Sequence, residues 1–214
     1  MYKLKTSYYK EPFEFFLFED FFSEEQLKDV WKELDFIVDN DLLNTDDQKE
    51  LGTAQDNNVP IAKRNGAFLS NVYKDFRKSS KIYQHIKQNF LWNEELNTSF
   101  PNSTLIRYLP RTNEDSVLVS LYKDGDYYKP HGDQSVMTLI VYLWKGEKSF
   151  EGGDLSFVDQ GLVFEPSYNE AILFPGCYEH EVSEIKSTIE GDTSFKRTSI
   201  TLFLTVGLNR TPNT

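Results

Sequence analysis

The chain has 214 residues, 39% of them hydrophobic and 15% aromatic, which is enough apolar material for a folded domain and excludes a disordered polypeptide. Its formal net charge of −11, with no lysine- or arginine-rich block, disfavours general binding to nucleic acid through the phosphates. The single cysteine, Cys177, excludes a disulfide framework and a cysteine-built zinc site, so any metal must take imidazole and carboxylate ligands.

The first 22 residues are aromatic but interrupted by acidic residues, so they lack the apolar core of a signal peptide. No apolar run approaches the roughly 20 residues that a membrane-spanning helix needs. We therefore expect a protein of the cytoplasm with no membrane partner. The sequence indicates no oligomeric state.

The N-terminal half alternates between structured and polar segments. Residues 13–22 predict a strand that leads into a helix over 24–38, where Ser23 and Gln26 form a capping box. Residues 40–65 are polar and aperiodic, which predicts a long loop, either a mobile surface segment or a lid that contacts substrate. A second helix is predicted over about 70–90, with Phe76 on its buried face; His85 lies beside that face without a carboxylate motif and is expected to be structural or exposed to solvent.

The second half of the chain has a different character, because short β-rich runs follow one another between Gly, Pro, Asn and Asp clusters. This spacing predicts a sandwich, jelly roll or barrel rather than a parallel sheet with crossover helices. We expect one domain over residues 1–214, with a helical support region over 1–100 and a β-rich core over 101–210. The predicted strands are TLIRYL (104–109), SVLVSLY (116–122), VMTLIVYLW (136–144), DLSFV (154–158), EAILF (170–174), HEVSEI (180–185) and RTSITLFLTV (197–206).

Two of the three histidines flank predicted strands of this core. His131 and Asp133 form a His-x-Asp pair between two strands, and His180 opens a strand 49 residues later. The His-x-Asp pair alone is weak evidence for a metal site, because a turn in which Asp133 hydrogen-bonds to the local backbone would also explain it. Two imidazoles and one carboxylate together are the facial set that suits non-haem Fe(II) with open coordination positions, although zinc accepts the same ligands.

A cation opens the last predicted strand. Arg197 precedes an otherwise apolar run, and an arginine that enters a β core needs an anionic partner because its desolvation is costly. The partner is either one of the many acidic side chains or the carboxylate of a ligand. Ser199 lies two residues on, on the same strand face, and Tyr142 could add its hydroxyl to a ligand carboxylate.

These residues carry a family resemblance. From about Ser116 to Val206 the order of motifs resembles the 2-oxoglutarate- and Fe(II)-dependent dioxygenases, and among them the prolyl 4-hydroxylase-like branch. The resemblance is weaker over the N-terminal half, where only the lead-in strand and helix are similar. The motifs are Tyr122-x-x-Gly125-x-x-Tyr128-x-x-His131-x-Asp133, FEGGDLSF (150–157), FPGCYEHEVSEI (174–185) and Arg197-x-Ser199.

The resemblance implies a double-stranded β-helix, a jelly-roll variant with mainly β structure and N-terminal helices. It also implies oxidative decarboxylation of 2-oxoglutarate by O2, coupled to hydroxylation of a substrate, with ascorbate as a candidate reductant. The implied roles are iron ligation by His131, Asp133 and His180, binding of the distal carboxylate of 2-oxoglutarate by Arg197 with Tyr142 and Ser199, a cosubstrate-pocket wall at Tyr122, and a tight turn at Gly152 and Gly153.

The sequence departs from the family pattern at one place. The segment KSTIEGDTSF (186–195) is longer than the usual turn before the arginine, and an extended hairpin would keep Arg197 in register; Lys196 and Arg210 are the alternatives if the register slips. Asp133 occupies the position that halogenating relatives leave small, so hydroxylation is expected. Phe203 stands where the nucleic-acid repair branch has a second arginine, so no nucleic-acid substrate is expected.

The substrate is the least determined part of the prediction. The resemblance favours a prolyl residue in a peptide or protein, with a free amino acid or another small molecule as the alternative within the class. Tyr127, Tyr128 and Trp144 are candidates for an aromatic substrate groove, although packing residues would give the same pattern. Outside the class, a non-catalytic cupin-like barrel could use the two histidines alone, but it would have no reason to bury Arg197 beside Tyr142.

Overall fold

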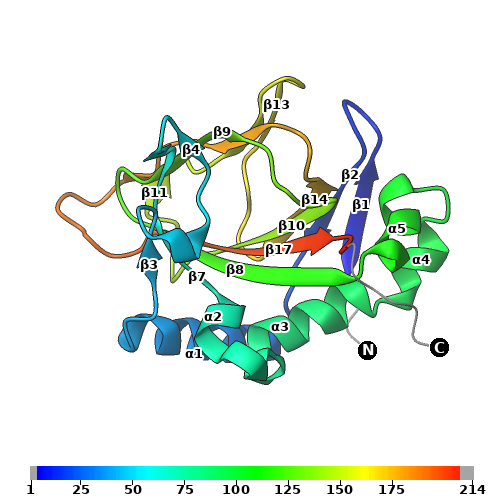
Figure 1. Ribbon diagram of the computed structural model, residues 1–214, viewed down its shortest axis with the longest axis horizontal. Coiled ribbons are helices and arrows are strands. Elements are labelled where there is room, and N and C mark those ends of the chain that lie inside the picture. Colours follow the sequence, from blue (N-terminus) through cyan, green and yellow to red (C-terminus); the bar gives the residue numbers. More distant parts are fainter. Residues whose placement is uncertain (1–3, 208–214) are drawn as a thin grey trace.

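The computed structural model describes residues 4–207, apart from the side chain of Asp75. Two antiparallel sheets lie face to face, with helices beneath the larger one (Figure 1). This is a mainly β architecture with supporting helices, the double-stranded β-helix expected from the motifs. Among the described residues no helix is both long enough and apolar enough to traverse a bilayer.

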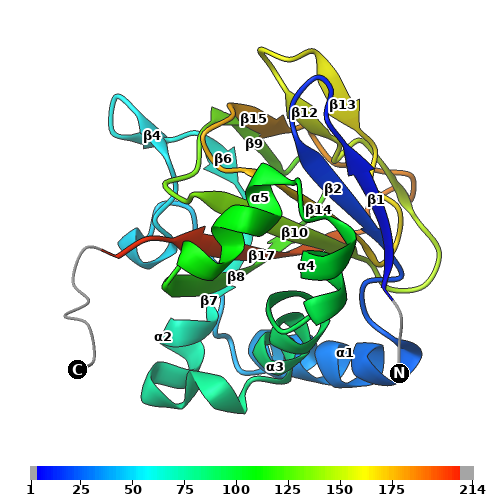
Figure 2. The same cartoon turned by 90° about the vertical axis from the view of Figure 1, so that its right-hand side faces the viewer.

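The larger sheet has eight strands in the order β1-β2-β14-β10-β17-β8-β7-β3, so strands from both ends of the chain meet in it. The N-terminal hairpin extends one edge by pairing β2 with β14 (Figure 2). Its strands are β1 (Lys5–Tyr9), β2 (Phe15–Glu19), β3 (Asn44–Thr45), β7 (Asn65–Phe68), β8 (Glu114–Tyr122), β10 (Met137–Leu143), β14 (Glu170–Pro175) and β17 (Arg197–Thr205).

The smaller sheet has five strands in the order β13-β12-β15-β9-β6. Its strands are β6 (Ala62–Lys63), β9 (Tyr127–His131), β12 (Leu155–Phe157), β13 (Leu162–Phe164) and β15 (His180–Val182). Two separate ribbons pair β4 (Gln55–Asp56) with β5 (Val59–Pro60), and β11 (Phe150–Glu151) with β16 (Lys186–Ser187).

The helices cover one face of the larger sheet and one of its ends (Figures 1 and 2). The first of them begins at the predicted capping box, in which Ser23 and Gln26 bond each other's backbone N–H groups. The helices are α1 (Glu24–Asp39), α2 (Leu69–Tyr73), α3 (Lys81–Ile86), α4 (Glu94–Ser99) and α5 (Thr104–Tyr108), with 3-10 turns at Lys49–Leu51, Lys74–Ser79 and Leu109–Arg111 and a π turn at Lys87–Leu91.

The larger sheet separates two hydrophobic cores. On the helix side, alternate residues of the central strands pack with α1 and α3; on the other side, the remaining residues face the smaller sheet. The segment expected to be a long loop, 40–65, carries the short strands β3 to β6, and two of these join the sheets. The N-terminal half therefore contributes strands as well as helices to the framework.

Two predicted elements were wrong. The run at 104–109 is not a strand but α5, because the Ser103 hydroxyl accepts the Ile106 N–H at 3.1 Å and starts a helix. The single helix over 70–90 is broken near Lys74, whose φ of +50° no helix accommodates, and Ser80 caps a new helix. Because of this break Phe76, predicted to be buried, is 74% exposed.

Among the strands that the sequence did not predict, β9 (Tyr127–His131) matters most for the histidine pair. The sequence had placed this segment between the predicted strands 116–122 and 136–144. The strand lies between β15 and β6, and it brings His131 to the inside of the fold.

Candidate active site

His131 and His180 are neighbours across two antiparallel strands. His131 ends β9, His180 begins β15, and the two residues are register partners. Asp133 follows on the turn after β9, where its backbone N–H donates to the Gly176 carbonyl at 2.8 Å. The topology of the smaller sheet thus brings together three side chains from two distant parts of the sequence.

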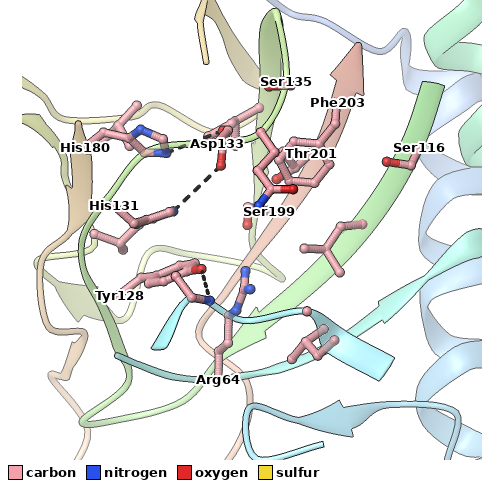
Figure 3. Close-up of a pocket in the computed structure, with 18 of the residues that line it drawn as sticks. Arg64, Ser116, Tyr128, His131, Asp133, Ser135, His180, Ser199, Thr201 and Phe203 are labelled. Carbon is pink, nitrogen blue, oxygen red and sulfur yellow. Dashed lines mark hydrogen bonds and ion pairs between the residues drawn. The ribbon is translucent and has the colours of Figure 1, made fainter. Parts of the chain in front are cut away.

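The three side chains converge on one point (Figure 3). One potential ligand atom from each lies within 4.8 Å of the others. The Nε2 atoms of His131 and His180 lie 3.8 and 3.6 Å from the carboxylate oxygens of Asp133. All three side chains are at most 10% exposed, so the cluster can hold a metal ion away from bulk water.

The backbone fixes the tautomer of both imidazoles. The Nδ1 of His131 lies 2.9 Å from the Lys129 carbonyl, and the Nδ1 of His180 lies 2.9 Å from the Tyr178 carbonyl. A carbonyl only accepts, so each Nδ1 carries the proton and each Nε2 turns a lone pair toward Asp133. This arrangement is the one that a metal-binding histidine requires.

Asp133 is held from the larger sheet. The Thr138 hydroxyl donates to its Oδ2 at 2.6 Å, and Ser135 bonds that hydroxyl at 2.7 Å. Burial raises the pKa of Asp133, against the opposing effects of His180 and Thr138. Burial and the neighbouring His180 lower the pKa of His131 to about 3, so the free imidazole is neutral and available to a metal near pH 7.

Arg197 is buried in the same region, and no acidic side chain within residues 4–207 pairs with it. It is 1% exposed, its guanidinium lies over the Tyr122 ring at 4.5 Å and the Tyr142 ring at 5.2 Å, and one Nη donates to the Gly153 carbonyl. Gly153 has φ +75°, and a Cβ there would crowd Arg197, so the predicted tight turn needs glycine for both reasons.

Two polar atoms beside this guanidinium have no hydrogen-bond partner among the described residues: Arg197 Nε and the Tyr142 hydroxyl. No carboxylate of the described chain forms an ion pair with Arg197 either. Burial of an uncompensated charge is costly. The pair of unused donors therefore fits an anionic ligand, such as the distal carboxylate of 2-oxoglutarate.

Lys196 is not free to take the place of Arg197, because its ammonium group pairs with Asp192. Arg197 itself is in register, opposite Tyr122 on β8, and Ser199 is paired with Tyr142 on β10. The long segment 186–195 is accommodated by β16 and the turns that follow it. Arg210 lies outside the described residues.

A cavity of about 420 Å³ joins the histidine cluster to Arg197. The central strands contribute Tyr122, Tyr142 and Ser199 to its wall. Leu51, Gly52 and Ala54 also line the cavity. Part of the 40–65 segment, predicted to be either a mobile surface segment or a lid, therefore forms part of the cavity wall.

The three aromatic candidates for the substrate groove occupy different environments. Tyr128 lines the cavity, and its ring stacks on His131 at 3.6 Å between centroids. Trp144 packs against Phe150 and Tyr168, and neither it nor Tyr127 lines the cavity. The packing interpretation therefore describes Trp144. His85 bonds Asp29 at 3.0 Å between α3 and α1, away from this site.

Arg64 is a cavity residue that the sequence did not suggest. It is 9% exposed, and its side chain points into the pocket below Tyr128 (Figure 3). Its position at the end of a polar segment, with no motif around it, offered little signal. The long-range pairings of β6 with β9 and of β7 with β8 bring it beside the site.

Comparison with known proteins gives a family for the core of the chain. Residues 117–205 match the model of the 2OG-Fe(II) oxygenase superfamily. No curated protein matches the sequence.

Solved structures share the fold at low sequence identity. A Pseudomonas putida prolyl-4-hydroxylase has a TM-score of 0.55 and 15% identity, over 90% of this chain and 92% of that one. NgTET1 in complex with 5mC DNA has a TM-score of 0.51 and 15% identity, over 90% and 72%. The viral collagen prolyl hydroxylase of Paramecium bursaria chlorella virus 1 has a TM-score of 0.48 and 16% identity, over 90% and 96%.

Fold, site and family match agree on one class: residues 117–205 match the Fe(II)- and 2-oxoglutarate-dependent oxygenases, and His131, Asp133 and His180 all lie within this segment. The fold is shared with a Pseudomonas putida prolyl-4-hydroxylase. The fold is also that of NgTET1, so the fold by itself does not select a substrate.

Proposed function

We propose that this enzyme hydroxylates a prolyl residue in a peptide or protein, with His131, Asp133 and His180 as the iron ligands and Arg197 as the anchor of 2-oxoglutarate. The observation that carries the cosubstrate assignment is the buried guanidinium of Arg197, which has an unused Nε and no acidic partner in the described chain. A metal-binding barrel without a cosubstrate would bury that charge at a cost and gain nothing.

The protein's residues have separable tasks in this scheme. The two Nε2 lone pairs and the Asp133 carboxylate would hold Fe(II), and Thr138 keeps the carboxylate oriented through its hydrogen bond. Tyr122 and Tyr142 fix the guanidinium plane, and the Tyr142 hydroxyl is free to donate to the same ligand carboxylate. Burial raises the pKa of Tyr142, which keeps this hydroxyl protonated as a donor.

Fe(II), when bound, would supply the electrons that activate O2 for decarboxylation of 2-oxoglutarate to succinate and CO2 and for insertion of oxygen into the substrate. Ascorbate is the candidate reductant that would restore Fe(II) after turnover without substrate. The chain's own part is to bind, orient and exclude water.

The residues that line the cavity favour an uncharged substrate group. Apart from the histidine cluster, the two arginines and the Gln134 amide, its wall is apolar or hydroxylated, and it includes Leu51, Phe68, Phe203, Ser116 and Thr205. A prolyl ring is apolar and uncharged, which suits such a wall. The Pseudomonas putida prolyl-4-hydroxylase, which shares the fold, suggests the prolyl residue as the substrate class to test first.

Succinate release tests the reaction. Purified protein with Fe(II), 2-oxoglutarate and ascorbate in air should release succinate slowly without substrate, and His131→Ala should abolish this release. His85→Ala is the matched control, since His85 also contacts an aspartate but lies among the helices. A wild-type protein that releases no succinate and shows no metal-dependent binding of 2-oxoglutarate would end the proposal.

A peptide library tests the substrate. Wild-type protein should add one oxygen, detected by mass spectrometry, to proline-containing peptides and leave the matched proline-to-alanine peptides unmodified. Oxygen gain on free amino acids alone would favour the small-molecule alternative. Arg197→Met protein serves as the inactive control in both assays.

A further inference from the structure

Arg64 stands at the centre of a closed set of contacts between the cavity wall and the histidine cluster. Its Nε donates to Asp46 Oδ1 at 3.3 Å, and its Nη1 donates to the Ser120 hydroxyl at 2.8 Å. Ser120 is fully buried on β8. The guanidinium is thereby fixed between the framework of the larger sheet and the segment that precedes it in sequence.

The free face of the guanidinium lies on an aromatic ring. Its carbon is 4.6 Å from the centroid of the Tyr128 ring. The Tyr128 ring in turn lies on the His131 imidazole, with centroids 3.6 Å apart and planes inclined by 12°. Arg64, Tyr128 and His131 therefore form three successive layers, of which the last is a proposed metal ligand.

Arg64 and Tyr128 also anchor the 46–54 segment, Arg64 through Asp46 and Tyr128 through Ala54. Asp46 Oδ1 also accepts the Thr53 hydroxyl at 2.5 Å, and the Ala54 N–H donates to the Tyr128 hydroxyl at 3.1 Å (Figure 3). The segment between these anchors, which includes Leu51 and Gly52, lines the cavity. One end of the wall is thus tied to Arg64 and the other to Tyr128.

We infer that Arg64 is a positioning residue that couples closure of the 46–54 cavity wall to the orientation of His131 through the ring of Tyr128. Arginine suits this task, because its planar guanidinium can donate at its edge to Asp46 and Ser120 while its face lies on an aromatic ring. Lysine could keep only the charge. The inference rests on the proposed role of His131 as a metal ligand.

Arg77 offers a matched control elsewhere in the molecule. It pairs with Asp115 at 2.8 Å, donates to the Tyr83 hydroxyl at 3.1 Å and lies over the Tyr83 ring at 4.5 Å, so it has the same three kinds of partner as Arg64: a carboxylate, a hydroxyl and an aromatic ring. It does not line the cavity. A general loss of stability on removing such an arginine would appear equally in both variants.

Two measurements on the full chain test the coupling: Co(II) affinity, by absorption titration of metal-free protein, and the rate of tryptic cleavage after the exposed Lys49. Arg64→Met should weaken Co(II) binding about tenfold and accelerate cleavage about tenfold. Arg64→Lys should give values between those of Arg64→Met and wild type. Arg77→Met should change neither the Co(II) affinity nor the cleavage rate by more than twofold. Asp46→Asn, a milder change, should move both in the same direction and serves if Arg64→Met does not fold.

Tyr128 separates the two halves of the coupling. Tyr128→Phe keeps the ring over His131 but loses the acceptor for Ala54, so cleavage should accelerate while Co(II) affinity stays within twofold. Tyr128→Leu removes the ring and should weaken both. Unchanged Co(II) affinity in Arg64→Met overturns the inference, whether or not cleavage accelerates, as does failure of the wild type to bind Co(II). Neither readout depends on succinate release, so loss of the proposed reaction and loss of this coupling are distinct results.

Discussion

The two faces of the larger sheet are built from the same strands but have opposite chemistry. In β17, Ile200, Leu202 and Leu204 belong to the helix-side core, whereas the alternating residues Arg197 and Ser199 line the cavity. On the helix side, these residues of β17 are aliphatic and pack in the hydrophobic core. The cavity side buries a charge and several hydroxyl groups, which a fold without a ligand has no reason to do. In this one strand, the helix-side residues stabilise the fold and the cavity-side residues form the proposed binding site.

The largest effect should come from the helix side. Leu202→Ala removes a fully buried side chain and should lower the free energy of unfolding by about 2–5 kcal/mol, because a cavity remains. Urea denaturation measures this loss. In the folded fraction, binding of 2-oxoglutarate with Co(II) should match wild type.

The neighbouring residue provides the control for that variant. Thr201→Val changes the cavity face one position earlier, and it should alter the free energy of unfolding by only about 1 kcal/mol. Equal destabilisation by both variants would mean that the two faces do not differ in the way described.

Arg197→Met should separate the two properties on the cavity side. Loss of the guanidinium should weaken 2-oxoglutarate binding about 100-fold, or about 2.8 kcal/mol, measured by calorimetry with Co(II) present. The ligand-free variant should be more stable than wild type by about 1–4 kcal/mol, because an uncompensated buried charge has been replaced by an apolar side chain.

That gain in stability is the decisive part of the Arg197 experiment. A destabilised Arg197→Met protein would show that the guanidinium contributes to folding, for instance through the Tyr122 and Tyr142 rings, rather than waiting for a ligand. Unimpaired Co(II) affinity in the same variant is also expected, since Arg197 is not part of the histidine cluster.

The smallest effect should come from Ser199→Ala. Ser199 lines the cavity beside Tyr142, and loss of one hydroxyl donor to a ligand carboxylate corresponds to about 1 kcal/mol, or roughly fivefold in 2-oxoglutarate affinity. The free energy of unfolding should barely change. A calorimetric titration that gives the wild-type affinity would remove Ser199 from the cosubstrate site.

Sequence reasoning reached the parts of the site that short-range patterns determine. His131 and Asp133 are two residues apart, and Arg197 and Ser199 share a strand face because side chains alternate. The fold class followed from the succession of short strands and the order of motifs. Arg64 was missed because its partners, Asp46 and Ser120, are 18 and 56 residues away in sequence.

The errors in secondary structure have local causes. In β9, Tyr128 and His131 belong to the site and Lys129 is exposed, so the strand lacks the apolar pattern that marks a strand of the core. In α5 the apolar run looked like a strand, and the deciding residue was Ser103, just before the run. Over 70–90 the regular apolar pattern continues across Lys74. The positive φ of Lys74 breaks the helix there, and amino-acid composition alone does not reveal such a φ.

The cross-strand pairing of His131 with His180 has a consequence for how the protein would come apart. An ion held by both would close a chain loop of about 50 residues, much as a covalent cross-link does, and would penalise every unfolded conformation in which these strands separate. Loading the site should therefore slow amide hydrogen exchange in β9 and β15 more than in the helices. The bound metal would therefore stabilise the pairing of β9 with β15 in the smaller sheet, in addition to its proposed part in the reaction.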